Sequence, residues 1–351
     1  MPDLADQIKL IAKDVGFDLV GIAKAKKYPE MFSFLEWVKS GYAADMHYLT
    51  DKVSPRLNIE EILPGVKSII SIGVLYDSKR ERSIEMRDKK KAWISRYAWN
   101  KDYHFTVRKM LDKLIEIMQK ELNLSFNYRR YVDTGPVLDR VFAYHAGLGW
   151  FGKNSCLIHP KLGSYFFIGE ILTDLELAPD ETIRDYCGSC TRCIDACPTD
   201  AIVKDGVIDS KKCISYQTIE NRGTIPKKIR EQIGHHVFGC DICQEVCPWN
   251  NKSPLTEQQD FFPDKDKYYP EINKLLDMIL NHYPSAFTKS PMKRAKQKGL
   301  LRNLIIVMGN SQNPEFIPIL QNLHIDSDNI LLETRNWAMQ QLEKPLLSPK
   351  N

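Results

Sequence analysis

The 351-residue chain has 43% hydrophobic and 27% charged residues, which is the composition of an ordinary globular protein with room for two or three domains. A membrane span is not expected, because no apolar run reaches the required length of about 18 to 20 residues. The N-terminal residues resemble neither a secretory signal nor a twin-arginine leader. We therefore expect a cytoplasmic protein, and the net charge of only +4 predicts that any nucleic-acid surface is local.

Strands and helices alternate through the first half of the chain. The hydrophobic pattern predicts helices at 3–15, 31–40, 55–64, 105–122 and 137–147, and strands at 17–23, 66–75, 128–132 and 164–173. Residues 77–91 are dense in alternating charge and are expected to form an exposed loop or helix. The alternation predicts an α/β or α+β domain over residues 1–180.

Two stretches of this domain have the character of a ligand site. Asp133 follows a strand and precedes Gly-Pro and a helix, a common place for a catalytic side chain, although many such aspartates only cap the next helix. The glycine-rich loop at 147–155 brings backbone N–H groups close to a ligand, but it lacks Walker A spacing. Cys156, at the end of this loop, is more simply a packed residue than a nucleophile.

The other eight cysteines lie between residues 187 and 247. The first four are spaced C-x2-C-x2-C-x3-C-P, the bacterial ferredoxin pattern in which the fourth cysteine binds the other cluster. The second group repeats this pattern with its first cysteine moved upstream to position 213. Exchanging the fourth ligands gives two complete [4Fe–4S] sets: Cys187, Cys190, Cys193 and Cys247 for one cluster, and Cys197, Cys213, Cys240 and Cys243 for the other.

Zinc and disulfides are the alternatives for these cysteines. Zinc also binds C-x2-C pairs, but it does not account for the fused four-cysteine run or for the proline after each closing cysteine. Disulfides fit poorly, because cysteines three residues apart on tight turns rarely cross-link. The spacing therefore predicts a ferredoxin-like domain over residues 181–253 and a function in electron transfer.

The chain becomes helical after Pro254. Helices are predicted from residue 291, at 314–323 and at 328–342, and paired short helices are typical of a HEAT-like repeat. We therefore expect a helical domain over residues 254–351. Its basic residues form a candidate phosphate-binding strip, or only a solvated helix face: Lys289, Lys293, Arg294, Lys296, Lys298 and Arg302.

The combination of these motifs resembles the epoxyqueuosine reductases over nearly the whole chain. The segments that carry the resemblance are 95–104, 131–140, 149–154, the cysteine region and 296–303. It implies an enzyme that reduces the epoxide of epoxyqueuosine, at the wobble position of tRNA, to the alkene of queuosine. It also implies two [4Fe–4S] clusters that pass electrons to cobalamin, which rests as cob(II)alamin.

The resemblance further implies roles for individual residues. Asp133 is expected to contact cobalamin and to donate the proton that opens the epoxide, with a pKa raised by burial beside the corrin. The other expected cobalamin contacts are Arg56, Tyr97, Leu157, Ile168 and Ser215. The expected substrate contacts are Tyr103, His104, Arg140, Lys153, Asn154, Asn221, Arg222, Lys293, Lys296, Lys298 and Arg302.

Structural roles compete with two of these assignments. An ion pair with Asp139 suits Arg140 equally well, and a satisfied core histidine suits His104 equally well. The expected partners are tRNA carrying epoxyqueuosine and an external low-potential donor of flavodoxin or ferredoxin type, acting on a monomer. Two other functions remain: a reductive dehalogenase-like cobalamin enzyme, which predicts an export leader and no basic tail, and a ferredoxin-type electron carrier, which leaves residues 1–180 without a role.

Overall fold

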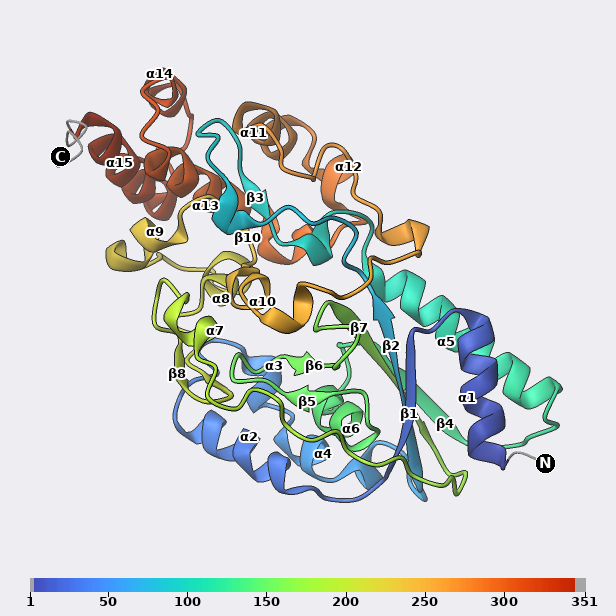
Figure 1. Ribbon diagram of the computed structural model, residues 1–351. Coiled ribbons are helices and arrows are strands. Elements are labelled where there is room, and N and C mark those ends of the chain that lie inside the picture. The colour runs from blue at the N-terminus through green and yellow to red at the C-terminus, as the bar shows by residue number, and fades with distance from the viewer. Residues whose placement is uncertain (1–2, 345–351) are drawn as a thin grey trace.

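The computed structural model describes residues 3–344, and Figure 1 shows a half built on a sheet and a helical half, with the cysteine-rich segment between them. The strands are β1 (Leu19–Lys24), β2 (Ser68–Leu75), β3 (Trp93–Ile94), β4 (Tyr128–Tyr131), β5 (Trp150–Phe151), β6 (Leu157–Ile158), β7 (Phe166–Thr173), β8 (Ile202–Lys204), β9 (Val207–Ile208) and β10 (His236–Phe238). The helices are α1 (Leu4–Val15), α2 (Pro29–Lys39), α3 (His47–Thr50), α4 (Val53–Leu57), α5 (Tyr103–Lys120), α6 (Asp139–His145), α7 (Arg192–Asp195), α8 (Ile214–Ile219), α9 (Lys227–Ile233), α10 (Ile242–Glu245), α11 (Ile272–Asn281), α12 (Tyr283–Phe287), α13 (Lys296–Asn310), α14 (Phe316–Gln321) and α15 (Asn329–Glu343).

The N-terminal sheet has the order β1-β2-β7-β4, and all of its pairings are antiparallel. This pairing agrees with an α+β class for the chain, but the α/β arrangement predicted for residues 1–180 is wrong, because alternation of elements along a chain does not determine strand direction. Helices cover both faces (Figure 1), so β2 is buried along its whole length. Ile70 and Ile72 pack beneath α1 and α5, whereas Ile69 packs with α6 on the opposite face.

Local signals account for the first helix as predicted. The Asp3 side chain accepts a hydrogen bond from the Asp6 N–H at the N-terminus of α1. Gly16 ends the helix in the left-handed region at φ +106°, where its N–H reaches the last turn. The predicted strand at 164–173 and helix at 105–122 are likewise confirmed as β7 and α5, with shifts of two residues at their starts.

After β2 the chain leaves the sheet and crosses to the helical half. β3 pairs in parallel with β10, and Trp93 and Ile94 share one hydrophobic core with α8, α11, α13 and α15. The expectation that 77–91 is simply exposed is wrong for Asp77 and Ser83, which are buried against the cysteine region. Since one core joins segments on both sides of residues 180 and 253, the predicted division into three domains stays a prediction.

α13 lies at the centre of the C-terminal helices and is buried from Gly299 to Gly309. The helices predicted at 314–323 and 328–342 are confirmed as α14 and α15. The HEAT-like organisation stays a prediction, and the last part of that predicted domain, 345–351, lies outside the described residues. Among residues 3–344, none of the helices combines the length and apolar character that crossing a bilayer requires.

Candidate active site and electron path

Asp133 lies on a tight turn between β4 and α6. Its φ of +59° is in the left-handed region, which aspartate tolerates better than most residues. The turn also requires Gly135, since a Cβ there would lie 2.2 Å from the Tyr131 ring. The Asp133 side chain is 68% exposed, so the protein alone does not provide the burial that was expected around it.

Two residues at the start of α5 hold the Asp133 carboxyl. The Tyr103 hydroxyl donates to Asp133 Oδ2 at 2.8 Å, and the Tyr103 ring stacks on Phe167 at a centroid distance of 4.0 Å. His104 Nε2 lies 3.9 Å from the same Oδ2. Packing therefore fixes the position of Tyr103, and Tyr103 in turn fixes one carboxyl oxygen, which leaves Asp133 Oδ1 for a substrate.

His104 is oriented by Asp102, the N-cap of α5. His104 Nδ1 lies 2.5 Å from Asp102 Oδ1, and Lys293 approaches the other carboxyl oxygen of Asp102 at 3.2 Å. Burial acts to raise the pKa of Asp102, but hydrogen bonding to His104 and the charge of that ring lower it to about 2. His104 Nε2 is buried and has no hydrogen-bond partner in the described protein, so this ring is not a fully satisfied core histidine.

Tyr97 connects this site to the cysteine region. Its ring meets Tyr103 edge-on at 6.3 Å between centroids and lies 6.0 Å from Phe238. On the other side, a Cβ on Gly239 would lie 3.7 Å from Tyr97 Cε1. Since Gly239 immediately precedes Cys240, Tyr97 separates the Asp133 site from one of the two cysteine sets.

Asp139 is a second carboxyl at this site, and sequence reasoning treated it only as an ion-pair partner. Burial, with the negative charge of Asp133 in addition, raises the pKa of Asp139 to about 8, although Arg140 and Arg56 lower it. Asp139 Oδ1 is buried without a hydrogen-bond partner among the described residues. Arg140 instead donates to the backbone oxygen and Oγ of Ser155, so its side chain braces the glycine-rich loop.

The first predicted cluster set surrounds a cavity at the surface. Cys187, Cys190, Cys193 and Cys247 all line this space, which has a volume of about 420 Å³. The Trp150 indole N–H donates to Cys187 Sγ at 3.5 Å. We refer to these four cysteines as the outer set.

The second predicted set lies against the glycine-rich loop, and we refer to it as the inner set. Its thiols, Cys197, Cys213, Cys240 and Cys243, influence one another electrostatically. The Cys156 thiol contacts Cys243, and Asn154 donates to the Cys243 backbone oxygen at 3.2 Å. Cys156 is therefore packed, as expected, but its neighbour is a predicted cluster ligand.

The cysteines form no disulfides in the structure. All nine are free thiols, so the disulfide alternative does not apply. Among the described residues, no group of three or more His, Cys, Asp or Glu side chains is arranged to hold a metal ion. Zinc requires its ligands around one centre, whereas the cysteines of a [4Fe–4S] cluster bind different irons and stand around the cluster.

The comparisons with known proteins agree with this geometry. Residues 186–250 match the family model described as "4Fe-4S double cluster binding domain", and residues 56–134 match "Epoxyqueuosine reductase QueG, DUF1730". The chain is 37% identical to the epoxyqueuosine reductase of Vibrio cholerae over 349 residues, which is 99% of this chain and 94% of the relative. The chain belongs to the epoxyqueuosine reductase family.

Solved structures of epoxyqueuosine reductases have the same fold. A crystal structure of epoxyqueuosine reductase with an epoxyqueuosine-modified tRNA-Tyr stem loop has a TM-score of 0.89 and 29% identity, covering 97% of this chain and 90% of that one. The Bacillus subtilis epoxyqueuosine reductase, solved with an aspartate catalytic loop swung out of its active site, has a TM-score of 0.85 and 29% identity, covering 97% and 91%.

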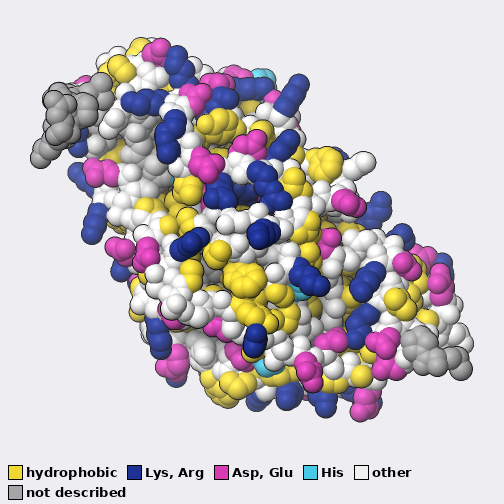
Figure 2. Space-filling model, in the orientation of Figure 1, with side chains coloured by type: hydrophobic (Ala, Val, Ile, Leu, Met, Phe, Trp, Pro, Cys, Tyr) yellow, Lys and Arg dark blue, Asp and Glu magenta, His cyan; other side chains and the backbone are white. Residues whose placement is uncertain are grey.

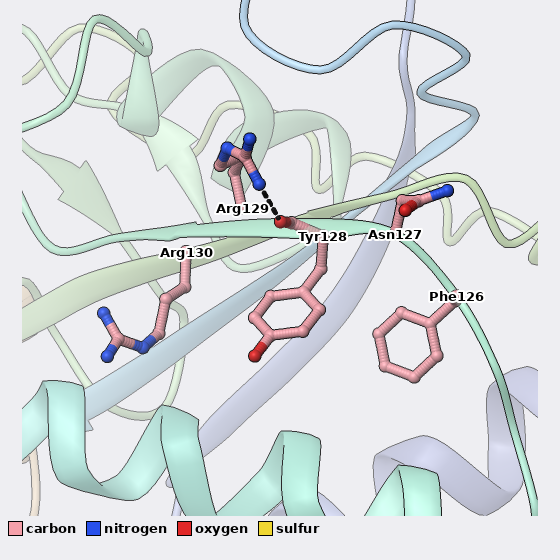
Figure 3. A pocket seen from close by; sticks show the side chains of 5 residues that line it. All are labelled: Phe126, Asn127, Tyr128, Arg129 and Arg130. Carbon is pink, nitrogen blue, oxygen red and sulfur yellow. Dashed lines mark hydrogen bonds between the residues drawn. The ribbon is translucent and has the colours of Figure 1, made fainter.

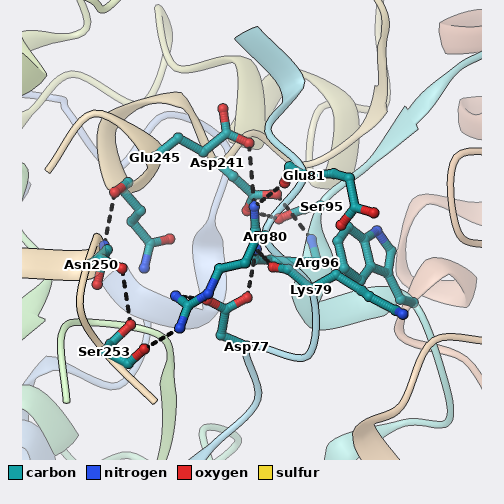
Figure 4. Close-up of polar contacts among 12 residues, drawn as sticks. Asp77, Lys79, Arg80, Glu81, Ser95, Arg96, Asp241, Glu245, Asn250 and Ser253 are labelled. Atoms are coloured by element: carbon teal, nitrogen blue, oxygen red, sulfur yellow. Dashed lines mark hydrogen bonds and ion pairs between the residues drawn. The ribbon is translucent and has the colours of Figure 1, made fainter. Parts of the chain in front are cut away.

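A buried arginine links the sheet half of this epoxyqueuosine reductase fold to the inner set. The Arg96 guanidinium donates to Asp77 Oδ1 at 2.5 Å and to two loop carbonyls, and it lies 3.8 Å from Glu245. The Arg96 backbone N–H donates to Asp241, the residue after Cys240 (Figure 4). Sequence reasoning missed this network, because its members are far apart along the chain.

The predicted basic strip borders the Asp133 site only in part. Lys293 and Arg294 are exposed, and Arg294 pairs with Glu220 at 2.9 Å while its guanidinium covers the Tyr48 ring. Arg222 donates to the Arg294 backbone oxygen. Lys296, with φ +63°, and Lys298, paired with Asp328 at 2.6 Å, begin α13. The strip is therefore a turn followed by a helix, rather than one helix.

Several predicted contacts are buried and play structural roles. Arg302 is 2% exposed and donates to the backbone oxygens of Gln217, Asn221 and Gly223, so its predicted phosphate contact is wrong. Asn221 is also buried, with its amide bonded to Gln217, and a base cannot reach it in this structure. Lys153 lines the outer-set cavity and pairs with Asp205 at 3.3 Å.

The remaining predicted cobalamin contacts come from α4, β6, β7 and α8. Arg56 is buried and donates to the Lys52 backbone oxygen. Leu157 is buried in the core that joins the sheet to α6, and Ile168 packs against that core from β7. The Ser215 backbone N–H is directed at the Cys213 thiol, which places Ser215 beside the inner set.

A further cavity lies at the edge strand β4, far along the sheet from the cysteines. It has a volume of about 470 Å³ and is lined by residues 126–130. Figure 3 shows Tyr128 and Arg130 on the side facing the helices and Arg129 on the opposite side, as strand alternation requires. Arg130 pairs with Asp112, and Arg129 donates to a backbone oxygen. None of the predicted site residues lies in this cavity.

Proposed function

We propose that the protein reduces epoxyqueuosine in tRNA to queuosine, with electrons from two [4Fe–4S] clusters and a bound cobalamin, and with Asp133 as proton donor. One observation carries this proposal. Asp133 is held by Tyr103 beside an unpartnered His104 nitrogen, and the Tyr97 ring leads from this group to the backbone at Cys240. The site therefore combines a proton source with the end of an electron path.

The relatives support both parts of this proposal. A relative of the same fold was solved with an epoxyqueuosine-modified tRNA stem loop, and another with an aspartate catalytic loop. Asp133 is an exposed aspartate in the left-handed region, and Tyr103 and His104 stand beside it, so we assign it that loop. A strained backbone at a functional side chain is common, because the surrounding fold holds the residue in place.

The residues present suit a cobalamin. The half-buried Tyr97 ring and the partly buried Ile168 offer an apolar surface, and His104 Nε2 is a buried polar atom without a partner in the described protein. Tyr97, Leu157, Ile168, Arg56 and Ser215 would hold the group between Asp133 and the inner set. When bound, cobalamin supplies a low-potential centre that passes electrons to the epoxide.

Asp133 has a defined task in this reaction. Conversion of the epoxide to an alkene and water consumes two electrons and two protons, and the epoxide oxygen must be protonated as its C–O bond breaks. Tyr103 occupies Asp133 Oδ2, so Oδ1 delivers the proton. The Asp133 side chain is largely exposed in the protein alone. We expect bound cobalamin and substrate to cover this side chain and to exclude water from it.

The basic residues beside Asp133 suit a tRNA anticodon. Lys293 and Arg222 are exposed near the site, and Lys289 and Lys296 are exposed with no ion-pair partner among the described residues. Tyr48, which is exposed, provides an aromatic surface for a splayed base. We propose Lys289, Lys293, Lys296 and Arg222 as phosphate contacts. Action as a cytoplasmic monomer stays a prediction.

The decisive experiment is turnover of a defined substrate. The protein is reconstituted anaerobically with iron, sulfide and cobalamin, then incubated with a stem loop carrying epoxyqueuosine and excess dithionite. Mass spectrometry of the nucleosides should show the loss of one oxygen atom. A sample without reductant is the control. The proposal fails if the fully loaded protein binds the stem loop and leaves the epoxide intact, and a carrier without catalytic function would then be favoured.

A further inference from the structure

The outer-set cavity has an unusual charge distribution at its rim. Its lining includes Lys153, Lys161, Arg192 and Lys252, whereas none of the residues that line it is acidic. Lys161, Arg192 and Lys252 are exposed, and none of the three has an ion-pair partner among the described residues. The rim therefore presents uncompensated positive charge directly around four predicted cluster ligands.

The centre of the same face is apolar and aromatic. Trp249 lies 5.1 Å from Trp150 and 5.6 Å from Tyr186 between ring centroids, and Tyr186 is 38% exposed. Figure 2 shows hydrophobic side chains over the region of α7, α10 and the β5–β6 hairpin, with lysine and arginine side chains around them. An apolar centre within a charged rim is the usual anatomy of a protein docking surface.

The acidic residues near this face lie outside the lining of the cavity. Asp185 accepts a hydrogen bond from the Cys187 N–H at 2.6 Å, and Asp195 accepts one from the Thr191 hydroxyl at 2.8 Å, so both keep their negative charge. Asp205 pairs with Lys153. The three unpaired cations are therefore the charges that stand directly around the cavity.

We propose that this face docks an acidic one-electron carrier protein, which reduces the cluster held by the outer set. The inference rests on the proposed function and adds the place of electron entry. Each docking event oxidises the carrier by one electron and reduces the outer cluster by one. Two events, with two protons, balance the conversion of the epoxide to the alkene and water. Electrons leave through the inner set, which adjoins Tyr97.

Charge and position favour a protein carrier over RNA at this face. A tRNA must present its modified base to Asp133, and the residues around Asp133, which are Tyr103, His104 and Lys293, do not line this cavity. RNA on the outer set would cover cluster ligands without reaching the proton donor. Small, weakly bound interfaces guided by opposite charge are typical of electron-transfer partners.

The test measures how fast a carrier reduces the clusters of the holoenzyme. Reduced flavodoxin, an acidic flavoprotein, is mixed anaerobically with the enzyme at several salt concentrations, and cluster bleaching is followed by stopped flow. The variant carries Lys161→Glu, Arg192→Glu and Lys252→Glu. The matched control carries Lys13→Glu, Lys109→Glu and Lys113→Glu, the same charge change on exposed positions of α1 and α5. Iron content and stem-loop binding are measured for each protein.

The docking variant should lose about tenfold or more in its second-order rate at low salt, and its rate should depend less on ionic strength. The control should stay within about twofold of the natural protein. An unchanged rate in the docking variant overturns the inference. If that variant also binds the stem loop more weakly, the face is an RNA surface instead. Failure of dithionite-driven turnover in the natural protein would refute the proposed function alone, since carrier-driven bleaching is measured independently.

Discussion

The two cysteine sets come from one repeated motif, yet they lie in different surroundings. The outer set lines a surface cavity rimmed by cations, whereas the inner set packs against Cys156, Asn154 and the backbone beside Tyr97. In the proposed electron path, the outer set receives electrons from a carrier protein and the inner set delivers them to the Asp133 site. Identical spacing in sequence therefore does not imply identical roles, because burial decides which partner each cluster can meet.

Removing one ligand from each set gives the largest expected contrast. Cys213→Ala should lose the inner cluster, keep about four irons and abolish turnover with every reductant. Cys190→Ala should also keep about four irons and lose carrier-driven turnover, but it should retain slow turnover with dithionite. Iron analysis and nucleoside mass spectrometry measure both. Equal loss of dithionite-driven activity in the two variants would contradict the inward and outward roles.

The proton donor can be separated from the electron path at Asp133. Asp133→Asn should lower turnover by about 100- to 10,000-fold, because the amide cannot supply the proton. Eight irons, bound cobalamin and stem-loop affinity should be unchanged, since the side chain is exposed and outside both cysteine sets. Single-turnover kinetics with dithionite measure the effect. Activity close to that of the natural protein would remove Asp133 from the mechanism.

The buried ion pairs of Arg96 should contribute more to stability than the half-exposed Arg80 does. Arg96→Leu leaves Asp77 and Glu245 buried without their cation, which costs about 3 to 5 kcal/mol in the free energy of unfolding. Denaturant unfolding of the reconstituted protein tests this. Arg80→Leu is the control, because Arg80 is half exposed, 3.8 Å from Asp77, and should cost at most about 1 kcal/mol. Equal costs would show that the buried pair is unimportant.

The basic strip should affect RNA binding and not electron entry. Lys289→Glu combined with Lys296→Glu should weaken stem-loop binding by about tenfold. The slope of log affinity against log salt concentration should become shallower by about one for each residue changed. Fluorescence anisotropy over a salt series measures both quantities. The control pair Lys109→Glu and Lys113→Glu lies on α5. A salt dependence identical to that of the natural protein would place the RNA surface elsewhere.

The smallest expected effect concerns Asp139 and pH. The pKa of Asp139 is raised from 3.8 to about 8, so between these pH values the folded state binds a proton that the unfolded state has lost. This contribution makes stability fall as pH rises through that window. Asp139→Asn should therefore gain a few degrees in Tm over the natural protein, with the gain growing from about pH 5 to pH 8.

A carboxyl with the opposite shift provides the control. Hydrogen bonding to Lys120 lowers the pKa of Glu116, so its contribution is complete above the ordinary pKa of 4.5. The difference between Glu116→Gln and the natural protein should therefore be constant from about pH 5 to pH 8. A constant difference for Asp139→Asn as well would show that Asp139 is ionised in the folded protein.

Sequence alone determined the features that depend on local chemistry. The caps of α1, the apolar stripe of α5, the buried strand β7 and the grouping of eight cysteines follow from residue type and spacing over a few positions. The position of Asp133 on a strand-to-helix turn was also predictable, since Gly135 and Pro136 end the strand. Family resemblance supplied the reaction, because no spacing in the chain indicates cobalamin.

Only the tertiary structure decided the features that depend on distant contacts. The antiparallel sheet order, the burial of Arg302 and Asn221, the Arg96 network and the raised pKa of Asp139 all arise where segments far apart in sequence meet. A basic or acidic side chain has the same identity in water and in a core, and its surroundings alone determine whether it binds a partner or supports the fold. For the same reason, folding determines which cysteine set faces solvent and which faces Asp133.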